Sequence, residues 1–344
     1  MYTPVETNNP DYIQGYIIIN WLAILGHLGS AIAMMSIYLD RDPLQIPYTE
    51  TYLQWNKFEN STKCNGRALE TRNEGKFCIA ATTSTIIECG ENGDEMCGLD
   101  LGWLVISFHL LSFVFQLSAA LTDYIPTKMQ AGEFEVEMEG CCGYKYSKMI
   151  KKGTNPLRFL EYGISAAIML MCIALLNGVT DINLIAAIAV LTSATEICGL
   201  VVEYLERVDM KWLLHLNGWL LFLCAYGIIY HAFNKAATAV DGIRPPDFVY
   251  VIVLALFLLY SSFGFVQLIE LTCETKLFDM FCCNCCEREA DPCKRCNISC
   301  CPALRVGKEK KRCNPLYKEM VYVTLSLGAK LVLGWLIFSN VLFN

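Results

Sequence analysis

The sequence predicts an all-α membrane protein, a single domain of 344 residues folded as a bundle of seven transmembrane helices. Composition is the first indication. Hydrophobic residues make up 54% of the chain and charged residues only 18%, whereas about 25% of the residues of a soluble domain are charged. The second is that seven apolar segments are each long enough to cross a hydrocarbon core of about 30 Å. They span approximately residues 14–38, 98–122, 157–179, 182–204, 212–234, 247–270 and 320–343.

The first segment lacks the features of a signal peptide. No basic residue precedes it and no small-residue cleavage site follows it, so it is predicted to be a retained helix. Residues 39–97 separate it from the second segment, and this loop is long enough to contain β-strands as well as turns.

The later segments are also apolar around most of their circumference, as lipid-embedded helices must be, because backbone groups in hydrocarbon find partners only within a helix or a closed barrel. A cysteine-rich loop, residues 271–319, separates the sixth segment from the seventh. Ionisable side chains within the spans are costly and are therefore candidate functional residues. They are His27, His109, Arg158, Glu161, Glu196, His215, His231 and Lys330.

Basic residues are distributed unevenly between the two ends of the predicted bundle. Seven spans place the termini on opposite sides, so the loops after the second, fourth and sixth segments share a side with the N-terminus. Those loops hold 17 Lys and Arg residues, and the opposite loops hold 8. The positive-inside rule therefore predicts a cytoplasmic N-terminus and an extracellular C-terminus. One local signal disagrees, because Arg41 follows the first segment while the N-terminal tail has no basic residue.

Cysteines of the first loop are candidates for disulfide bonds. The predicted orientation places this loop outside the cell, where disulfides persist. Four cysteines allow three pairings, and the sequence does not choose among them. The four are Cys64, Cys78, Cys89 and Cys97.

The loop between the sixth and seventh segments carries ten of the 19 cysteines, including the run CCNCCEREADPCKRCNISCC. C-x2-C pairs of this kind are the usual ligands of a structural zinc ion, and the candidate ligands are Cys282, Cys285, Cys293 and Cys296. The alternative is palmitoylation, for which clustered cysteines beside a membrane are the usual setting. Both interpretations stay open.

The stretch YVTLSLGAKLVLGW, residues 322–335, contains the only charge of the seventh segment, Lys330. A lysine at this depth costs about 2.5–3.5 kcal/mol on insertion scales, so a compensating partner is expected. Glu161 lies at a matching depth in the third segment and is the best candidate. Ser326 precedes the lysine by four residues and shares its face of the helix. A desolvated lysine in this setting can carry an aldehyde cofactor as a protonated Schiff base; a plain salt bridge is the alternative.

At these residues the chain resembles the heliorhodopsins. The segment VYVTLSLGAKLVLGW is similar to their seventh helix, and RFLEYGISAAIM is similar to their third. The resemblance implies retinal bound to Lys330, Glu161 as its counterion, Ser326 as a hydrogen-bond partner of the Schiff base, and Ser165 in the same site. Opsin-like receptors have an outside N-terminus and an NPxxY-like motif after the lysine, and neither is found here.

The first two segments extend the resemblance. NWLAILGHLGSAIAM gives Asn20, His27 and Met34 at the family's spacing, and WLVISFHLLS gives His109. The resemblance implies that the two histidines lie near the cytoplasmic side of the retinal and accept or relay its proton, because imidazole titrates near neutral pH. It also implies an inverted topology and a homodimer that uses the first extracellular loop.

Glu196 departs from the family pattern, because the resemblance implies an apolar residue at this position in most heliorhodopsins. A carboxyl at this depth is a functional hypothesis by default. It either conducts protons or is protonated and hydrogen-bonded to Ser193 or Thr192. The sequence thus predicts a light-responsive, retinal-binding protein with light-activated proton conduction. The alternative is a photosensor that signals to a cytoplasmic partner. Neither an enzyme activity nor a nucleic-acid partner is expected.

Overall fold

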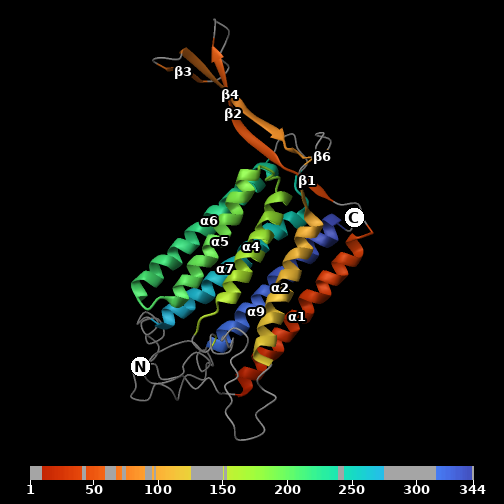
Figure 1. Ribbon diagram of the computed structural model, residues 1–344, viewed down its shortest axis with the longest axis vertical. Helices are drawn as coiled ribbons and strands as arrows, with labels where there is room; N and C mark the ends of the chain where they lie inside the picture. The colour runs from red at the N-terminus through yellow and green to blue at the C-terminus, as the bar shows by residue number, and fades with distance from the viewer. Residues whose placement is uncertain are drawn as a thin grey trace.

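The computed structural model shows an elongated helical bundle with a strand-rich extension at one end (Figure 1). It describes residues 10–40, 44–58, 67–71, 75–89, 95–96, 98–124, 150, 153–238, 244–274 and 315–342. Within these residues, seven helices are long and apolar enough to cross a membrane, which confirms the predicted fold class. They are α1 (Pro10–Tyr38), α2 (Leu101–Tyr124), α4 (Pro156–Leu176), α5 (Ile182–Tyr204), α6 (Val208–Ala237), α7 (Asp247–Glu274) and α9 (Pro315–Ile337), which continues into the π-helical turn η2 (Phe338–Leu342).

Helix α4 runs through the middle of the bundle, with α1, α2 and α9 on one side and α5, α6 and α7 on the other (Figure 1). In its apolar window 67% of the residues are buried inside the protein, compared with 50% for α9 and at most 39% for each of the other five helices. Side chains of α4 and α9 therefore face protein on most sides and are the ones best placed to form an internal site.

Helices α1 and α9 begin at the same end of the bundle and run side by side. Gly15 lies against Met320 near the start of both helices, and farther along the Trp335 indole N–H donates to the Ser30 hydroxyl (3.3 Å). The end at which these two helices begin is called the N-terminal end below.

The interior is packed with apolar side chains from facing helices. Phe108 of α2, Leu170 and Ile173 of α4, Ile252 of α7 and Leu333 of α9 are fully buried in one cluster. Lipid tails are as apolar as these side chains, so helix association in a membrane depends on close van der Waals packing. The cluster therefore fixes which helices are neighbours and how deeply each side chain lies.

Local signals set the ends of α4 and α5. The Asn155 side chain accepts from the Arg158 backbone N–H (3.2 Å) and Pro156 occupies the first turn, both typical of a helix start. Gly178 follows the end of α4 with φ 80°, a left-handed conformation that glycine adopts without strain. Asp181 then caps α5 by accepting from two backbone N–H groups. Hydrogen bonding from the Thr51 side chain, together with these cap bonds, holds the pKa of the Asp181 carboxyl below the ordinary value.

The second helix begins at Leu101, three residues later than predicted. Asp100 accepts from the Trp103 backbone N–H (3.0 Å) and from the Tyr38 hydroxyl (2.5 Å). The Tyr38 oxygen in turn accepts from the Leu44 N–H (3.1 Å). This network joins the end of α1 to the start of α2, so residues 98–100 pair as a strand instead of extending the helix.

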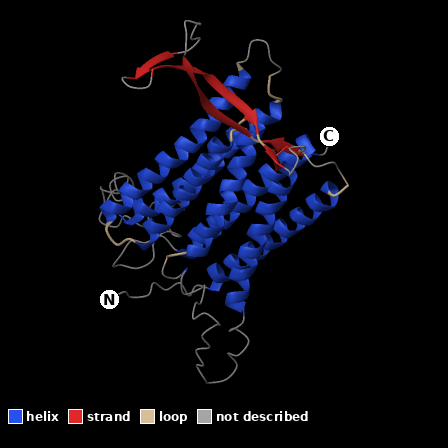
Figure 2. Ribbon diagram, turned by 45° about the horizontal axis from the view of Figure 1, so that its top comes forward, coloured by secondary structure: helices blue, strands red, loops and turns tan. Residues whose placement is uncertain are grey.

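Strands occupy much of the first loop, at the end of the bundle opposite to the N-terminal end (Figure 2). Three of them form the antiparallel sheet β2-β4-β3, β1 pairs with β7, and β5 pairs with β6. Thr49 anchors the sheet to the turn between α4 and α5, because its N–H donates to the Thr180 carbonyl (2.9 Å). The strands are β1 (Gln45–Pro47), β2 (Thr49–Phe58), β3 (Arg67–Thr71), β4 (Gly75–Ile86), β5 (Glu88–Cys89), β6 (Glu95–Met96) and β7 (Gly98–Asp100).

Most of the predicted cysteine sites fall outside the described residues. This applies to Cys64 and Cys97, and to all four candidate zinc ligands between residues 282 and 296. Cys78 lies on β4 and Cys89 on β5. No cluster of side chains able to hold a metal ion is found in the part of the chain that the structure describes, so zinc remains a prediction without structural support.

Candidate functional site

The seventh-segment lysine lies at the centre of the bundle in contact with the two partners expected from the sequence. Lys330 is 3% exposed, and its Nζ donates to Glu161 Oε1 (2.5 Å) and to Ser326 Oγ (3.0 Å). Ser326 reaches it because residues four apart share one face of a helix. Glu161 reaches it because the central helix α4 faces α9.

The carboxylate also has a partner that the sequence analysis did not identify. The Ser112 hydroxyl of α2 is hydrogen-bonded to Glu161 Oε1 (2.5 Å), and the Lys330 ammonium lies 5.2 Å from the centre of the Tyr162 ring. A buried ion pair needs such additional contacts, because removing both charges from water costs several kcal/mol. A serine within an apolar span, one turn from His109, was the available sequence signal for Ser112.

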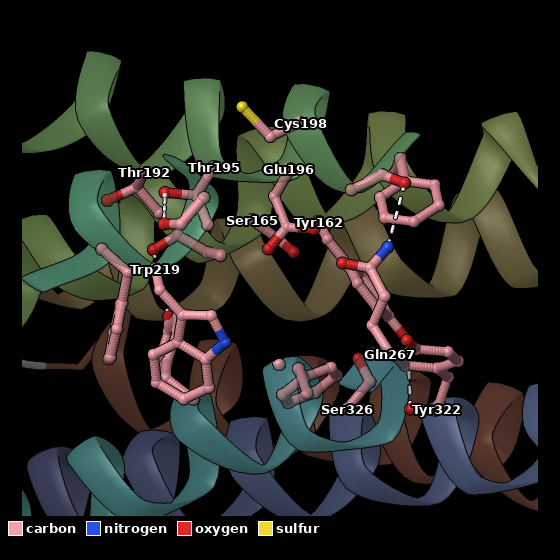
Figure 3. A pocket seen from close by; sticks show the side chains of 18 of the residues that line it. Tyr162, Ser165, Thr192, Thr195, Glu196, Cys198, Trp219, Gln267, Tyr322 and Ser326 are labelled. Carbon is pink, nitrogen blue, oxygen red and sulfur yellow. Dashed lines mark hydrogen bonds between the residues drawn. The ribbon is translucent and has the colours of Figure 1, made fainter. Parts of the chain in front are cut away.

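Lys330 lines a cavity between α4, α5, α6, α7 and α9. Figure 3 shows other residues of the cavity wall, among them Ser326 and Trp219. The cavity encloses about 960 Å³ not filled by protein atoms, a volume that includes open space at its mouth. Its walls include Trp219, Phe222, Tyr260 and Phe263. An apolar, aromatic cavity with a single primary amine at one point fits a long hydrophobic aldehyde such as retinal.

Glu196 faces the same cavity from α5, and Figure 3 shows it among residues that include Ser165 and Trp219. Its expected alternative partners are engaged elsewhere: the Thr192 hydroxyl donates to the Ile188 carbonyl (2.7 Å) and the Ser193 hydroxyl to the Gly163 carbonyl (2.8 Å). Among the described residues no hydrogen bond to the Glu196 carboxyl is found.

Ser165, predicted from the resemblance to be in the retinal site, also lines this cavity. Its hydroxyl is fully buried and has no hydrogen-bond partner within the described part of the chain. A buried hydroxyl without a partner is costly, so a polar group of a bound molecule, or a water, has a position to occupy beside it.

The two predicted relay histidines contact each other and not the cavity wall. His27 and His109 are completely buried, with their Nδ1 atoms 3.1 Å apart. A hydrogen bond between these atoms requires that one ring donates and the other accepts. Both Nε2 atoms lack partners within the described residues.

The structure corrects the expected position of this histidine pair along the bundle axis. The resemblance placed it near the cytoplasmic, N-terminal side of the retinal site. Instead, His109 packs against Gly334, one turn beyond Lys330 and away from the N-terminal end. Met34 lies against the same glycine, and Asn20 is buried two turns before His27 on α1. The pair therefore lies on the side of the lysine opposite to Ser326.

A second histidine site lies on the far wall of the cavity, and no specific role was predicted from the sequence for its histidine, His215. The Trp219 indole N–H donates to His215 Nε2 (3.0 Å), and His215 Nδ1 lies 3.1 Å from Gln267 Oε1. These contacts specify a neutral ring with its proton on Nδ1, because Nε2 must accept. Gln267 donates to the Gly199 carbonyl (3.1 Å). The four-residue spacing between His215 and Trp219 was the sequence signal that these two side chains lie on one face of the helix.

The position of Trp219 depends on a glycine of the neighbouring helix. A Cβ added at Gly264 of α7 would lie 2.6 Å from the indole ring, so Gly264→Ala should destabilise the protein by about 1–3 kcal/mol through overpacking. Gly328→Ala is the matched control, because no atom lies within 4 Å of its added Cβ, and in a helix it should stabilise by about 0.5–1 kcal/mol. Thermal unfolding in one detergent compares the two, and equal melting temperatures would contradict this packing.

Comparison with known families supports the resemblance drawn from the sequence. The heliorhodopsin family model matches residues 136–279, a stretch that includes Glu161, Ser165 and Glu196. This match confirms the resemblance to heliorhodopsins predicted from the sequence. Lys330 and Ser326 lie outside it, so their assignment rests on the geometry of the site. No curated protein matches the chain.

Proposed function

We propose that this heliorhodopsin-like chain binds retinal covalently at Lys330 and responds to light. One observation carries the proposal: a primary amine lies in the middle of a membrane-spanning helix, beside a buried carboxylate and at the edge of an aromatic cavity. Retinal, when bound, supplies an aldehyde that condenses with the amine and a polyene that isomerises on absorbing light.

The surrounding residues would perform three tasks toward this group. Glu161 stabilises positive charge on the nitrogen of Lys330, and Ser326 orients the same nitrogen through a second hydrogen bond. Aromatic side chains exclude water from the polyene, and Ser165 offers a hydroxyl in the wall. Because the pocket has low polarity, the charge on the nitrogen depends strongly on the Glu161 carboxylate.

We further propose that light opens a proton path in which Glu196 takes part. A carboxyl in an apolar helix, with no hydrogen-bond partner among the described residues, is stabilised in its protonated form by burial. Movement of charge at Lys330 and Glu161 changes the electric field in the shared cavity. Glu196 can then release its proton for a short time and take up another.

A photocurrent measurement tests this function. The parent protein, expressed in cells under voltage clamp, should give light-evoked currents whose reversal potential follows the proton gradient. Glu196→Gln should reduce them at least about tenfold, because it keeps the packing and removes only the titrating group, as expected for a proton-transfer residue. The visible absorption band should remain.

Two controls accompany this experiment. Glu206→Gln, an exposed change shortly after α5, should leave the current unchanged.

An N-terminal epitope tag should be accessible only after permeabilisation if the proposed cytoplasmic N-terminus is right. Of the 17 basic residues counted on that side, Lys211 and Lys318 are buried in helices, which leaves a clear excess. A parent protein without photocurrent at any voltage would contradict conduction and favour the photosensor alternative.

A further inference from the structure

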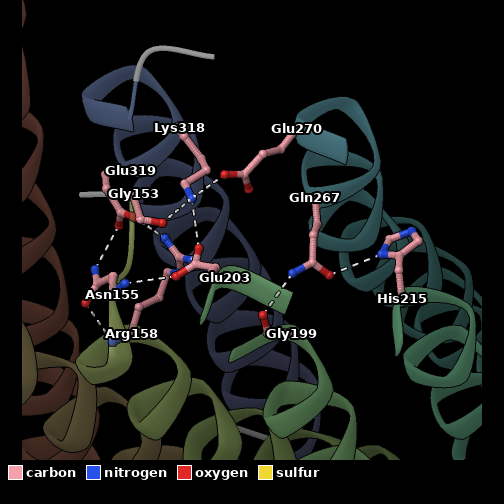
Figure 4. Close-up of polar contacts among 10 residues, drawn as sticks. All are labelled: Gly153, Asn155, Arg158, Gly199, Glu203, His215, Gln267, Glu270, Lys318 and Glu319. Atoms are coloured by element: carbon pink, nitrogen blue, oxygen red, sulfur yellow. Dashed lines mark hydrogen bonds and ion pairs between the residues drawn. The ribbon is translucent and has the colours of Figure 1, made fainter. Parts of the chain in front are cut away.

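Five ionisable side chains, four of them buried, form a cluster at the N-terminal end of the bundle (Figure 4). They come from four helices, two that begin here and two that end here. The members are Arg158 of α4, Glu203 of α5, Glu270 of α7, and Lys318 and Glu319 of α9. Glu319, near the start of α9, suits the helix dipole. The other four do not, because cations at helix starts and carboxylates at helix ends are unfavourable, so mutual contacts explain their positions.

Two of the three carboxyl groups have every oxygen occupied as an acceptor. Glu203 pairs with Arg158 and Lys318 through Oε1, and its Oε2 accepts from the Asn155 backbone N–H (2.8 Å). Glu319 pairs with Arg158 through Oε1, and its Oε2 accepts from the Asn155 side-chain amide (2.9 Å). An ionised carboxylate only accepts, so both groups are ionised, and they balance the charges of Arg158 and Lys318.

Glu270 is the third carboxyl and has no cation left to balance it within the cluster. Its Oε1 accepts from Lys318 Nζ (2.9 Å), and no hydrogen bond to its Oε2 is found among the described residues. Its side chain is 23% exposed, whereas those of the other four members are 1–4% exposed. The free oxygen can therefore hold a proton and also exchange it with water.

Charged and polar groups of the neighbouring helices define the surroundings of this carboxyl. Lys318 and Glu203 are the nearest charged neighbours, and Arg158 lies behind them. On α6, His215 contacts Gln267, one turn before Glu270, and Lys211 is buried one turn earlier in α6 and has contacts of its own. His215 is neutral in the hydrogen-bonded form described above.

The cluster is connected to the lysine site through Arg158. This arginine lies one turn before Glu161 on α4, and its guanidinium carbon is 4.0 Å from the centre of the Tyr322 ring. The backbone carbonyl of Tyr322 accepts from the Tyr162 hydroxyl (3.0 Å), and Tyr162 lines the cavity. A charge that moves near Glu161 therefore acts on Arg158 across a dry, protein-filled distance, where electrostatic interactions are weakly screened.

We propose that Glu270 is the proton-exchange group of the N-terminal end of the bundle. In the dark it carries a proton on the oxygen that Lys318 does not bind. When a proton moves from the nitrogen of Lys330 to Glu161, positive charge approaches Arg158 and the ionised form of Glu270 becomes more stable. The O–H bond of Glu270 then breaks, and the proton passes to water at that end. This proposal rests on the proposed light response of the Lys330 site.

Infrared spectroscopy tests the dark state independently of that light response. The full-length protein in lipid should show a carbonyl stretch of a protonated carboxylic acid that is absent in Glu270→Gln and retained in Glu206→Gln. Glu196→Gln should remove a different component of the same spectral region. An unchanged spectrum in Glu270→Gln would show that the carboxyl is ionised in the dark, and the proposal would be wrong.

Flash photolysis with a pH-indicator dye tests the exchange step. The parent should release a proton transiently, and Glu270→Gln should lower the amplitude or rate at least about tenfold, while Glu270→Asp should restore much of it. Release that persists unchanged in Glu270→Gln would overturn the assignment. If the parent has the dark infrared component but shows no photocycle, the failure lies with the proposed function; if it has a photocycle but lacks that component, the failure lies with Glu270.

Discussion

Lys330→Ala protein mixed with all-trans retinal should have no visible absorption band. Only a primary amine can condense with the aldehyde, and the described part of the cavity wall contains no lysine other than Lys330. The loss should be complete, because no neighbouring side chain in the wall can replace the nitrogen. Absorption spectra of purified protein before and after addition of retinal measure it.

Alanine also leaves Glu161 buried without its cation, which costs about 3–5 kcal/mol when one partner of a buried pair is removed. Lys330→Arg separates the two effects, since it keeps a positive charge beside Glu161 but cannot bind the aldehyde. Lys318→Arg is the matched control, a buried lysine of the same helix outside the cavity, and should keep the band. A visible band in folded Lys330→Arg would disprove retinal attachment at this residue.

Glu161→Gln should change the colour of the protein more than any other substitution that keeps Lys330. The carboxylate lies 2.5 Å from the lysine nitrogen and is its only acidic contact among the described residues. Without it, positive charge on that nitrogen is poorly stabilised in a pocket of low polarity. On titration from acid to alkali, the visible band should give way to near-ultraviolet absorption at a clearly lower pH than in the parent.

Ser112→Ala provides the control for this prediction. This substitution removes one hydrogen bond to Glu161 and keeps the carboxylate. The pH at which the visible band is lost should therefore shift much less than in Glu161→Gln. If Glu161→Gln titrates like the parent while Glu196→Gln does not, Glu196 is the counterion and the assignment of roles must be exchanged.

Several properties of this protein could be predicted from the sequence because they follow from local rules. A helix in lipid must be apolar for about 20 residues, so hydropathy located all seven spans. The same rule made Lys330 conspicuous as the only charge of its segment, and helical periodicity placed Ser326 on its face. Glu161 could be found by depth alone, because the start of its helix was visible in the sequence.

Tertiary structure decided which groups share a site. Ser112 joins Glu161, and His215 joins Gln267, only because α2 packs against α4 and α6 against α7. The level of the His27–His109 pair was likewise set by the contact of His109 with Gly334 of α9. Neighbour relations between helices arise from side-chain packing over the whole bundle, which no local pattern records.

The ends of the helices show the same difference between what the sequence predicts and what the tertiary structure decides. Hydropathy placed the start of the seventh segment near residue 320, because Lys318 and Glu319 count as polar, yet α9 begins at Pro315 and buries both. The sequence by itself determined that seven spans exist and that a lysine lies within the last. Only the folded bundle brings Arg158, Glu203 and Glu270 to these two residues, because a charge can be buried where charges from other helices balance it.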